Sequence, residues 1–240
     1  MTDLGETYAP TTSSIGFLRA SLDDASAALH QWRSRLHGSA DAEPLSGGLS
    51  ANVAALEPLT TGVAPRELLV ATRNPEWTAI FDCGLPSGDP VSTVGHLSRT
   101  MACQGVVVAY IPDRMASGGL PERYGALQLE MFGPLPTEFL NYVRTISLVR
   151  DGVRWRFDAT GTVQDFEDVD AYSRRKIAER FTRAMLVEYC AALGLEPLDD
   201  GFYPGPSVLV SLGITPPAGA LALTRAEAQR WLGITPLGAE

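Results

Sequence analysis

Lysine and cysteine are both scarce in this chain. Lys176 is the only lysine among 19 basic side chains, and there are three cysteines in 240 residues. Three widely spaced cysteines exclude a disulfide-stapled miniprotein, and we expect them to be reduced. The 28 acidic side chains give a formal net charge of −9. This acidity argues against a general nucleic-acid binder, because such proteins need a basic surface.

Long apolar runs are also missing. The sequence has no stretch of about 18 consecutive apolar residues, which a transmembrane helix requires. Residues 1–6 are polar and acidic, unlike the basic start and apolar stretch of a secretory signal. We therefore expect a cytoplasmic protein with no membrane contact. Hydrophobic residues make up 45% of the chain, enough to build a packed core and to exclude a disordered protein.

The common catalytic and metal-binding motifs are absent too. The sequence has no Gly-rich phosphate loop with lysine, no His-Glu-x-x-His, no paired Cys-x-x-Cys and no Gly-x-Ser-x-Gly. None of the three histidines stands at the spacing of metal ligands. The sequence therefore predicts no cofactor and no metal site.

An apolar seam near the start predicts an amphipathic N-terminal helix over residues 15–36. Ser13 or Ser14 would cap its first turn. The helix would lie against the protein's own body or against a second copy, which keeps a homodimer through residues 15–36 open. Residues 37–50 are rich in Gly, Ser and Ala and predict a flexible linker. The seam consists of Ile15, Leu18, Leu22, Ala25, Leu29, Trp32 and Leu36.

Residues 51–240 predict a single α+β domain with a mostly antiparallel sheet. Helices are expected over 89–103 and 168–193, and both would pack on the sheet. The Asp151-Gly152 pair is a strong hairpin turn. The segment 106–111 is apolar throughout, so that strand should be covered on both faces. The expected strands are 53–59, 67–72, 77–83, 106–111, 124–132, 142–149 and 153–159.

The end of the chain carries a short repeat. Leu212–Pro216 recurs as Leu232–Pro236, and in each copy we expect glycine to end an element. Between the copies, Thr224 and Glu227 match a capping box and predict a short helix over 225–231. We expect this tail to dock on the body of the domain.

One segment offers residue types for catalysis, between residues 82 and 96. An enzyme interpretation makes Cys83 the nucleophile and His96 its base, with Asp82 or Asp89 orienting the imidazole. The structural interpretation is favoured. His96 falls on the side of its predicted helix away from the apolar stripe, and Asp89 is explained as a helix cap.

A second segment separates charge along the chain. Four acids within 165–170 precede five basic residues within 174–183. Acids at a helix start and i,i+4 ion pairs explain this pattern structurally. The alternative is a protein-contact surface, because arginine and aromatic residues are enriched at interfaces. The residues expected to contact a protein partner are Glu76, Trp77, Asp82, Asp165, Glu167, Asp168 and Asp170.

Three blocks of the sequence resemble a known group of proteins. They are Pro75–Asp82, the Asp-Gly hairpin with Trp155-Arg156-Phe157, and Arg174–Thr182. Over residues 65–210 the chain resembles cytoplasmic α+β proteins of high-GC bacteria, some of which look like immunity proteins of toxin systems. The shared blocks are structural, so the resemblance assigns no functional residue.

The sequence thus favours a non-enzymatic cytoplasmic protein-binding module, in its specific form an immunity protein that neutralises a basic toxin. Its acidity would steer a basic partner and speed association. The alternative is a small-molecule enzyme with a pocket beside the 82–96 loop. In either case we expect neither nucleic acid nor membrane as a partner.

Overall fold

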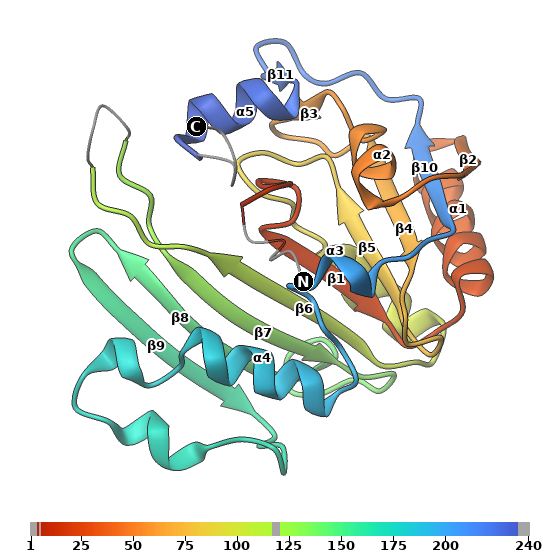
Figure 1. Ribbon diagram of the computed structural model, residues 1–240. Coiled ribbons are helices and arrows are strands. Elements are labelled where there is room, and N and C mark those ends of the chain that lie inside the picture. Colours follow the sequence, from red (N-terminus) through yellow and green to blue (C-terminus); the bar gives the residue numbers. More distant parts are fainter. Residues whose placement is uncertain (1–3, 5, 117–120, 235–240) are drawn as a thin grey trace.

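A large antiparallel sheet forms the centre of the protein. The computed structural model describes residues 4, 6–116 and 121–234, and the sheet has nine strands in the order β2-β10-β4-β5-β1-β6-β7-β8-β9 (Figure 1). The α+β class with a mostly antiparallel sheet is confirmed. The strands of the sheet are β1 (Ser14–Leu18), β2 (Ala40–Leu45), β4 (Arg66–Ala71), β5 (Thr78–Asp82), β6 (Gly105–Ile111), β7 (Ala126–Phe132), β8 (Tyr142–Asp151), β9 (Arg154–Gly161) and β10 (Ser207–Leu212).

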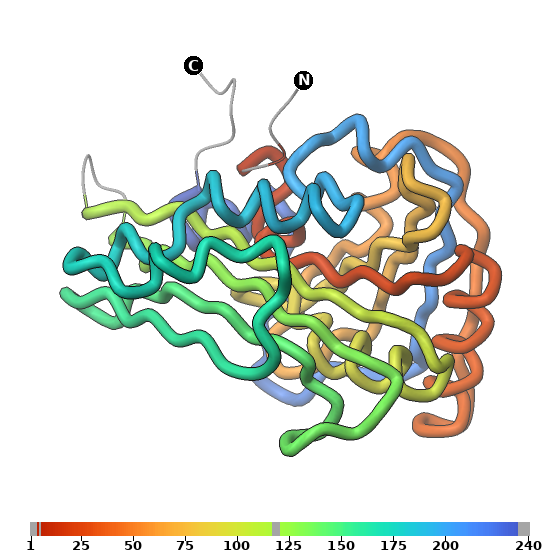
Figure 2. Tube along the Cα trace, turned by 90° about the horizontal axis from the view of Figure 1, so that it is seen from below, coloured from red at the N-terminus to blue at the C-terminus, as the bar shows by residue number. Residues whose placement is uncertain are grey.

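Helices cover the two faces of this sheet unequally. The remaining elements are α1 (Leu22–His37), α2 (Leu49–Ala54), α3 (Val91–Thr100), α4 (Arg183–Ala192), α5 (Arg225–Leu232), the 3-10 turns η1 (Val169–Ser173), η2 (Ile177–Glu179) and η3 (Asp200–Phe202), and a small pair of strands, β3 (Leu59–Thr60) with β11 (Ala222–Leu223). In Figure 1, α4 lies in front of β7 and β8, whereas α3 lies behind the sheet. The front core includes Leu129 and Phe181, and the back core includes Leu29 and Val94. Behind β7, β8 and β9 most of the sheet face has no helix over it, as both views show (Figures 1 and 2).

The central strands and α3 follow the sequence pattern. The strands expected at 67–72, 77–83, 106–111 and 124–132 are β4 to β7, and the helix expected at 89–103 is α3. β6 is covered on both faces as expected, because Val106 belongs to the front core and Val107 to the back core. An apolar run without alternation therefore identified a strand inside the sheet.

The β8–β9 hairpin is confirmed, with one correction. Asp151 pairs with Arg154, so the turn consists of Gly152 and Val153, and Gly152 has φ of 59°. Trp155 and Phe157 pack against the front core. Val153 was expected to begin the second strand, but it is 89% exposed because it stands in the turn.

The expected N-terminal helix was wrong at its start, and so was the flexible linker. Ile15 and Leu18 belong to β1, which pairs with β5 and β6 in the middle of the sheet. α1 begins only at Leu22, after Ser21, whose hydroxyl accepts from the Asp24 amide. Residues 37–50 include β2, an edge strand on β10, and the start of α2. Two segments of this region, Ser14–Leu18 and Ala40–Leu45, are therefore strands of the sheet. In the first of them, burial within the sheet overrides a helix-like spacing.

The long helix expected over 168–193 was also wrong in extent. Only α4 is an α-helix there, and it begins after Thr182, whose side chain accepts from the Met185 amide. Upstream, Asp168 caps η1 through the Ala171 amide. Arg174 leaves η1 in an extended conformation. Local capping by polar side chains thus competes with a continuous helix. The strand expected over 53–59 is mostly α2 and the turn after it.

The C-terminal helix is confirmed. Thr224 and Glu227 form the capping box, and Gly233 ends α5 in the left-handed region with φ of 63°. Gly213 follows the end of β10. Gln229 Nε2 donates to the Ala9 carbonyl at 2.9 Å, which docks α5 on the N-terminal segment. Thr235 and Pro236 of the second repeat lie outside the described residues. In the part of the chain that is described, no helix combines the length and apolarity needed to cross a membrane.

Candidate functional site

The open part of the back sheet face carries polar side chains in register. Glu130 of β7 stands opposite Thr145 of β8, which stands opposite Thr160 of β9. Their neighbours along the strands, such as Leu129 and Ile146, point to the front core. Alternation along a strand therefore leaves a row of polar groups on the part of the back face that α1 and α3 do not cover.

A loop between β7 and β8 forms a wall beside this row. Asn141 Nδ2 donates to the Gly95 and Gly133 carbonyls at 3.0 and 2.8 Å and to Ser98 Oγ at 2.9 Å, which ties the loop to α3. The loop turns tightly, since the Thr137 amide donates to the Leu140 carbonyl at 2.9 Å. This turn presents three large apolar side chains to solvent: Leu135, Phe139 and Leu140 are 73%, 68% and 62% exposed.

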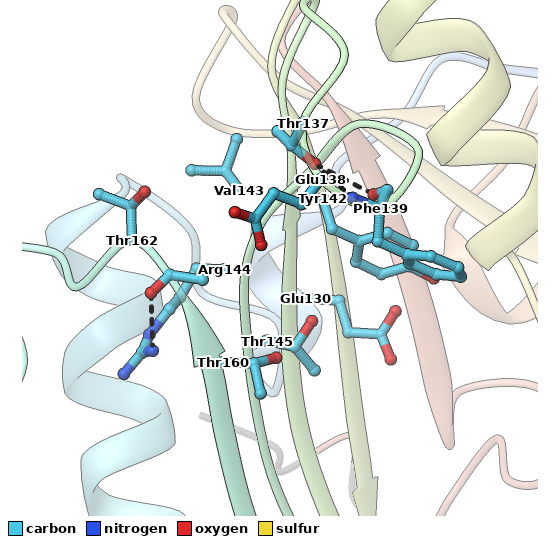
Figure 3. Close-up of a pocket in the computed structure, with 11 residues that line it drawn as sticks. Glu130, Thr137, Glu138, Phe139, Tyr142, Val143, Arg144, Thr145, Thr160 and Thr162 are labelled. Atoms are coloured by element: carbon cyan, nitrogen blue, oxygen red, sulfur yellow. Dashed lines mark hydrogen bonds between the residues drawn. The ribbon is translucent and has the colours of Figure 1, made fainter.

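The wall and the strands enclose a hollow of about 880 Å³ (Figure 3). Its lining includes two carboxylates, two aromatic rings and several threonine hydroxyls, among them Glu130, Glu138, Phe139, Tyr142, Thr145 and Thr160. The rings of Phe139 and Tyr142 lie 5.6 Å apart. A second hollow of about 380 Å³ shares Glu130 and continues toward the 85–91 loop, where Asp89 lines it. Glu130 thus stands between two concave sites on the open face.

The electrostatics of this site centre on Glu130. One of its oxygens, Oε2, is buried and has no hydrogen-bond partner among the described residues. Burial raises the pKa of Glu130, and the nearby Asp89 raises it further, while a hydrogen bond with Tyr142 opposes the shift. Burial also raises the pKa of Tyr142 to about 12, with Glu130 adding to the effect. A partly desolvated carboxylate beside aromatic rings is suited to a cationic group, which would satisfy its free oxygen.

The structure does not assemble the candidate catalytic residues of the 82–96 segment. Cys83 packs in the front core, and its Sγ lies 3.9 Å from Thr60 Oγ1. His96 lies on α3 behind the sheet and stacks on Trp32 at a ring distance of 4.1 Å. Burial raises the pKa of the Cys83 thiol, so it is poorly ionised at neutral pH. The expected pairing of Cys83 with His96 is therefore not formed.

Asp82 has a structural arrangement of its own. Its carboxylate is buried and accepts hydrogen bonds from the Gly84 and Asp89 amides at 2.8 and 2.9 Å. Burial raises the pKa of this carboxyl to about 7. These bonds shape the loop that lines the smaller hollow.

The residues expected to contact a partner do not form one surface. Trp77 is buried, and Glu167 is enclosed in an ion pair with Arg144. Glu76 is exposed and pairs with Arg19 at 2.7 Å. Asp165, Asp168 and Asp170 are exposed on the segment between β9 and α4. Of the seven, Trp77, Asp82 and Glu167 are internal, where a partner does not reach them.

Sequence reasoning missed Glu130, Tyr142 and Phe139. A signal for the first was present: Gln128 and Glu130 alternate with apolar residues along β7, as expected for a strand with one uncovered face. Nothing in the order of residues showed that Phe139 and Tyr142 would line the same hollow as Glu130, because the path of the β7–β8 loop and the start of β8 place them there.

The class of the protein is an α+β fold built on one antiparallel sheet with an open polar face. The chain matches no family model, no curated protein and no solved structure. Its function must therefore be argued from the site itself, since a fold alone does not specify one.

Proposed function

We propose that this chain is a non-enzymatic protein-binding module that receives a basic side chain of its partner in the hollow beside Glu130. The observation that carries the proposal concerns Oε2 of Glu130, which is buried without a hydrogen-bond partner among the described residues, in a hollow with Tyr142 and Phe139 in its wall. A buried carboxylate oxygen that lacks a partner is costly unless a donor reaches it. An arginine or lysine of a partner supplies that donor.

The surroundings of Glu130 fit a protein partner better than a small metabolite. The β7–β8 loop, part of which lines the hollow, exposes the apolar side chains of Leu135, Phe139 and Leu140, and Phe139 lines the hollow itself. Interfaces combine such apolar contacts with a few charged anchors, and arginine is a frequent anchor. The aromatic rings favour a cation stacked against them. The net charge of −9 would steer a basic partner toward the chain.

In its specific form, the proposal describes an immunity protein of the cytoplasm that covers the active site of a basic toxin. The exposed acids Asp165, Asp168 and Asp170 would contribute to the attractive field rather than to direct anchoring. The described structure does not support the enzyme alternative built on Cys83 and His96, because the two residues lie on opposite sides of the sheet.

The basic-side-chain site can be tested with two small probes. Arginine amide and citrulline amide have nearly the same shape and the same α-ammonium group, but only the side chain of arginine is charged. In an NMR titration, arginine amide should shift the Phe139 and Tyr142 ring signals, and citrulline amide should not. Equal shifts from both probes would contradict the proposal.

Two variants make the test specific. Glu130→Gln should abolish the arginine response, because it removes the acceptor charge while keeping the shape. Glu43→Gln changes the net charge by the same amount on the exposed edge strand β2 and should leave the response intact. Capture of proteins from the native cell with the same two variants then tests the partner: a partner retained equally by Glu130→Gln would overturn the assignment.

A further inference from the structure

The strand β9 is one edge of the sheet, and its free backbone groups can be assigned. The Thr162 amide donates to the Val143 carbonyl at 2.8 Å, in register with the β8–β9 pairing. In an antiparallel pair, residues that bond to the partner strand alternate with residues that do not. The even-numbered residues of β9 therefore bond to β8. Trp155, Phe157 and Ala159 turn their backbone N–H and C=O groups outward.

We propose that two copies of this chain pair their β9 strands antiparallel about Phe157. In this register the backbone of Phe157 forms hydrogen bonds with the backbone of Phe157 in the second copy. On either side, the backbone of Trp155 forms them with the backbone of Ala159. All of these residues are the ones with free backbone groups. Arg156 then stands opposite Asp158 of the second copy, twice by symmetry. The interface is isologous, as in most soluble dimers.

Charge selects this register over its neighbours. Centring the pair on residue 158 places Asp158 opposite Asp158. Centring it on residue 156 places Arg156 opposite Arg156, although Arg154 then faces Asp158. The register centred on Phe157 is the one of these that sets opposite charges face to face without any like-charge pair. Centring the pair on Trp155 places Arg154 opposite Arg156. Like charges directly opposite each other destabilise a sheet, whereas opposite charges stabilise it. The Arg156–Asp158 pairs would occupy non-hydrogen-bonded positions, where facing side chains are closest.

The apolar side of β9 also suits a second copy. Trp155 packs over Gly125, where an added Cβ would lie 2.8 Å from its ring. The Phe157 ring lies 5.0 Å from that of Tyr172. Both side chains are half-buried and face the front core. In the dimer, large Trp155 would stand opposite small Ala159, so the half-buried apolar side chains of the two β9 strands could pack together without steric conflict.

Charges on an edge strand usually prevent association. Here Arg154 and Arg156 are followed by Asp158 on the same face. The charges of one β9 strand are therefore complementary to those of a second, antiparallel β9 strand. In the single chain, Arg156 pairs with Asp151 at 2.6 Å, but both side chains are largely exposed. Such a pair contributes little and can exchange for one between copies.

The pairing has a consequence for the site beside Glu130. Residues opposite each other in a sheet lie on the same face, so both open faces would lie on one side of a sheet that runs through both copies. Two hollows would then face a partner together, and a partner with two basic anchors would bind with avidity. This consequence rests on the proposed function, whereas the pairing itself does not.

Sedimentation velocity over a range of protein concentrations tests the pairing. The wild type should form a dimer, while Arg156→Asp and Asp158→Arg should each remain monomeric because like charges face each other. The double variant with both changes restores opposite charges in exchanged positions and should dimerise again. Arg154→Asp, with the same change in charge opposite the neutral Thr160, should still dimerise.

Monomeric wild type at all concentrations would overturn the pairing, and so would dimers of either single reversal. A double variant that stays monomeric while its thermal unfolding matches the wild type would also overturn it. Arginine amide should still bind Arg156→Asp, so a failure of the pairing is distinguishable from a failure of the proposed function.

Discussion

Arg144 and Glu167 form a two-pronged ion pair inside the protein. Arg144 Nε and Nη2 donate to the two carboxylate oxygens at 2.9 and 2.6 Å, and the side chains are 4% and 0% exposed. The Tyr172 hydroxyl and the Gln164 amide each donate to Glu167 at 2.8 Å. Glu167 therefore fastens the segment between β9 and α4 to the front of the sheet.

Glu167→Ala should destabilise the protein strongly, because it leaves the Arg144 charge buried without a partner. The expected loss in the free energy of unfolding is about 3–5 kcal/mol. Urea denaturation measures it, and Asp170→Asn on the exposed surface is the control. A loss no larger than that of the control would contradict the role of this buried ion pair in stability.

Two glycines, Gly16 and Gly105, allow Val94 of α3 to pack closely against the sheet. A Cβ at Gly16 would lie 2.6 Å from Val94 Cγ2, and a Cβ at Gly105 would lie 2.6 Å from Val94 Cγ1. Gly105→Ala should therefore cost about 1–3 kcal/mol through overpacking. Combined with Val94→Ala, it should cost less than the sum of the two single changes. Gly48→Ala, with no atom within 4 Å of the added Cβ, is the matched control, and additivity would contradict this packing.

The buried Asp82 should make stability depend on pH. Burial raises its pKa from 3.8 to about 7, and the nearby charges of Glu67 and Asp89 act in the same direction. The folded state then binds the proton more tightly than the unfolded chain. The free energy of unfolding should fall as pH rises from about 4 to about 7, by roughly 4 kcal/mol from this group, and level off above. Asp82→Asn should flatten this dependence in urea titrations, whereas the exposed Asp41→Asn should not.

Glu130→Gln should stabilise the protein at neutral pH while removing the proposed site. Burial raises the pKa of Glu130, so its charged form opposes folding, and Gln keeps a hydrogen-bonding oxygen for Tyr142. The expected gain is about 1 kcal/mol, typical of a residue kept for function at a cost in stability. It should shrink at acidic pH, where Glu130 is protonated in both states. Glu138→Gln, at an exposed position of the same hollow, should show no such gain.

The three thiols should react at different rates with a soluble thiol reagent. Cys103 is half-buried, whereas Cys83 and Cys190 are buried. Burial raises the pKa of all three thiols, most clearly that of Cys190. Cys103 should therefore react first, and the other two should react only as the protein unfolds. Rapid modification of Cys83 in the folded protein would revive the enzyme interpretation.

Local patterns in the sequence were sufficient to predict the elements that interactions between neighbouring residues determine. The Asp151-Gly152 pair predicted the β8–β9 hairpin, and the Thr224–Glu227 capping box predicted α5, because each pattern closes within a few residues. The apolar run of β6 likewise indicated a strand buried on both faces.

Packing between segments that are distant in the sequence decided the other elements and the site. Ile15 and Leu18 have the spacing of a helix, yet they belong to β1, which pairs with β5 and β6 and buries Ile15 in the front core and Leu18 in the back core. The site followed the same rule. The sequence shows Glu130 in β7 and Tyr142 twelve residues later, but only the fold leaves the sheet face that carries Glu130 open and places the β7–β8 loop beside it. Which polar groups remain uncovered is a property of packing between distant segments, and no local pattern encodes it.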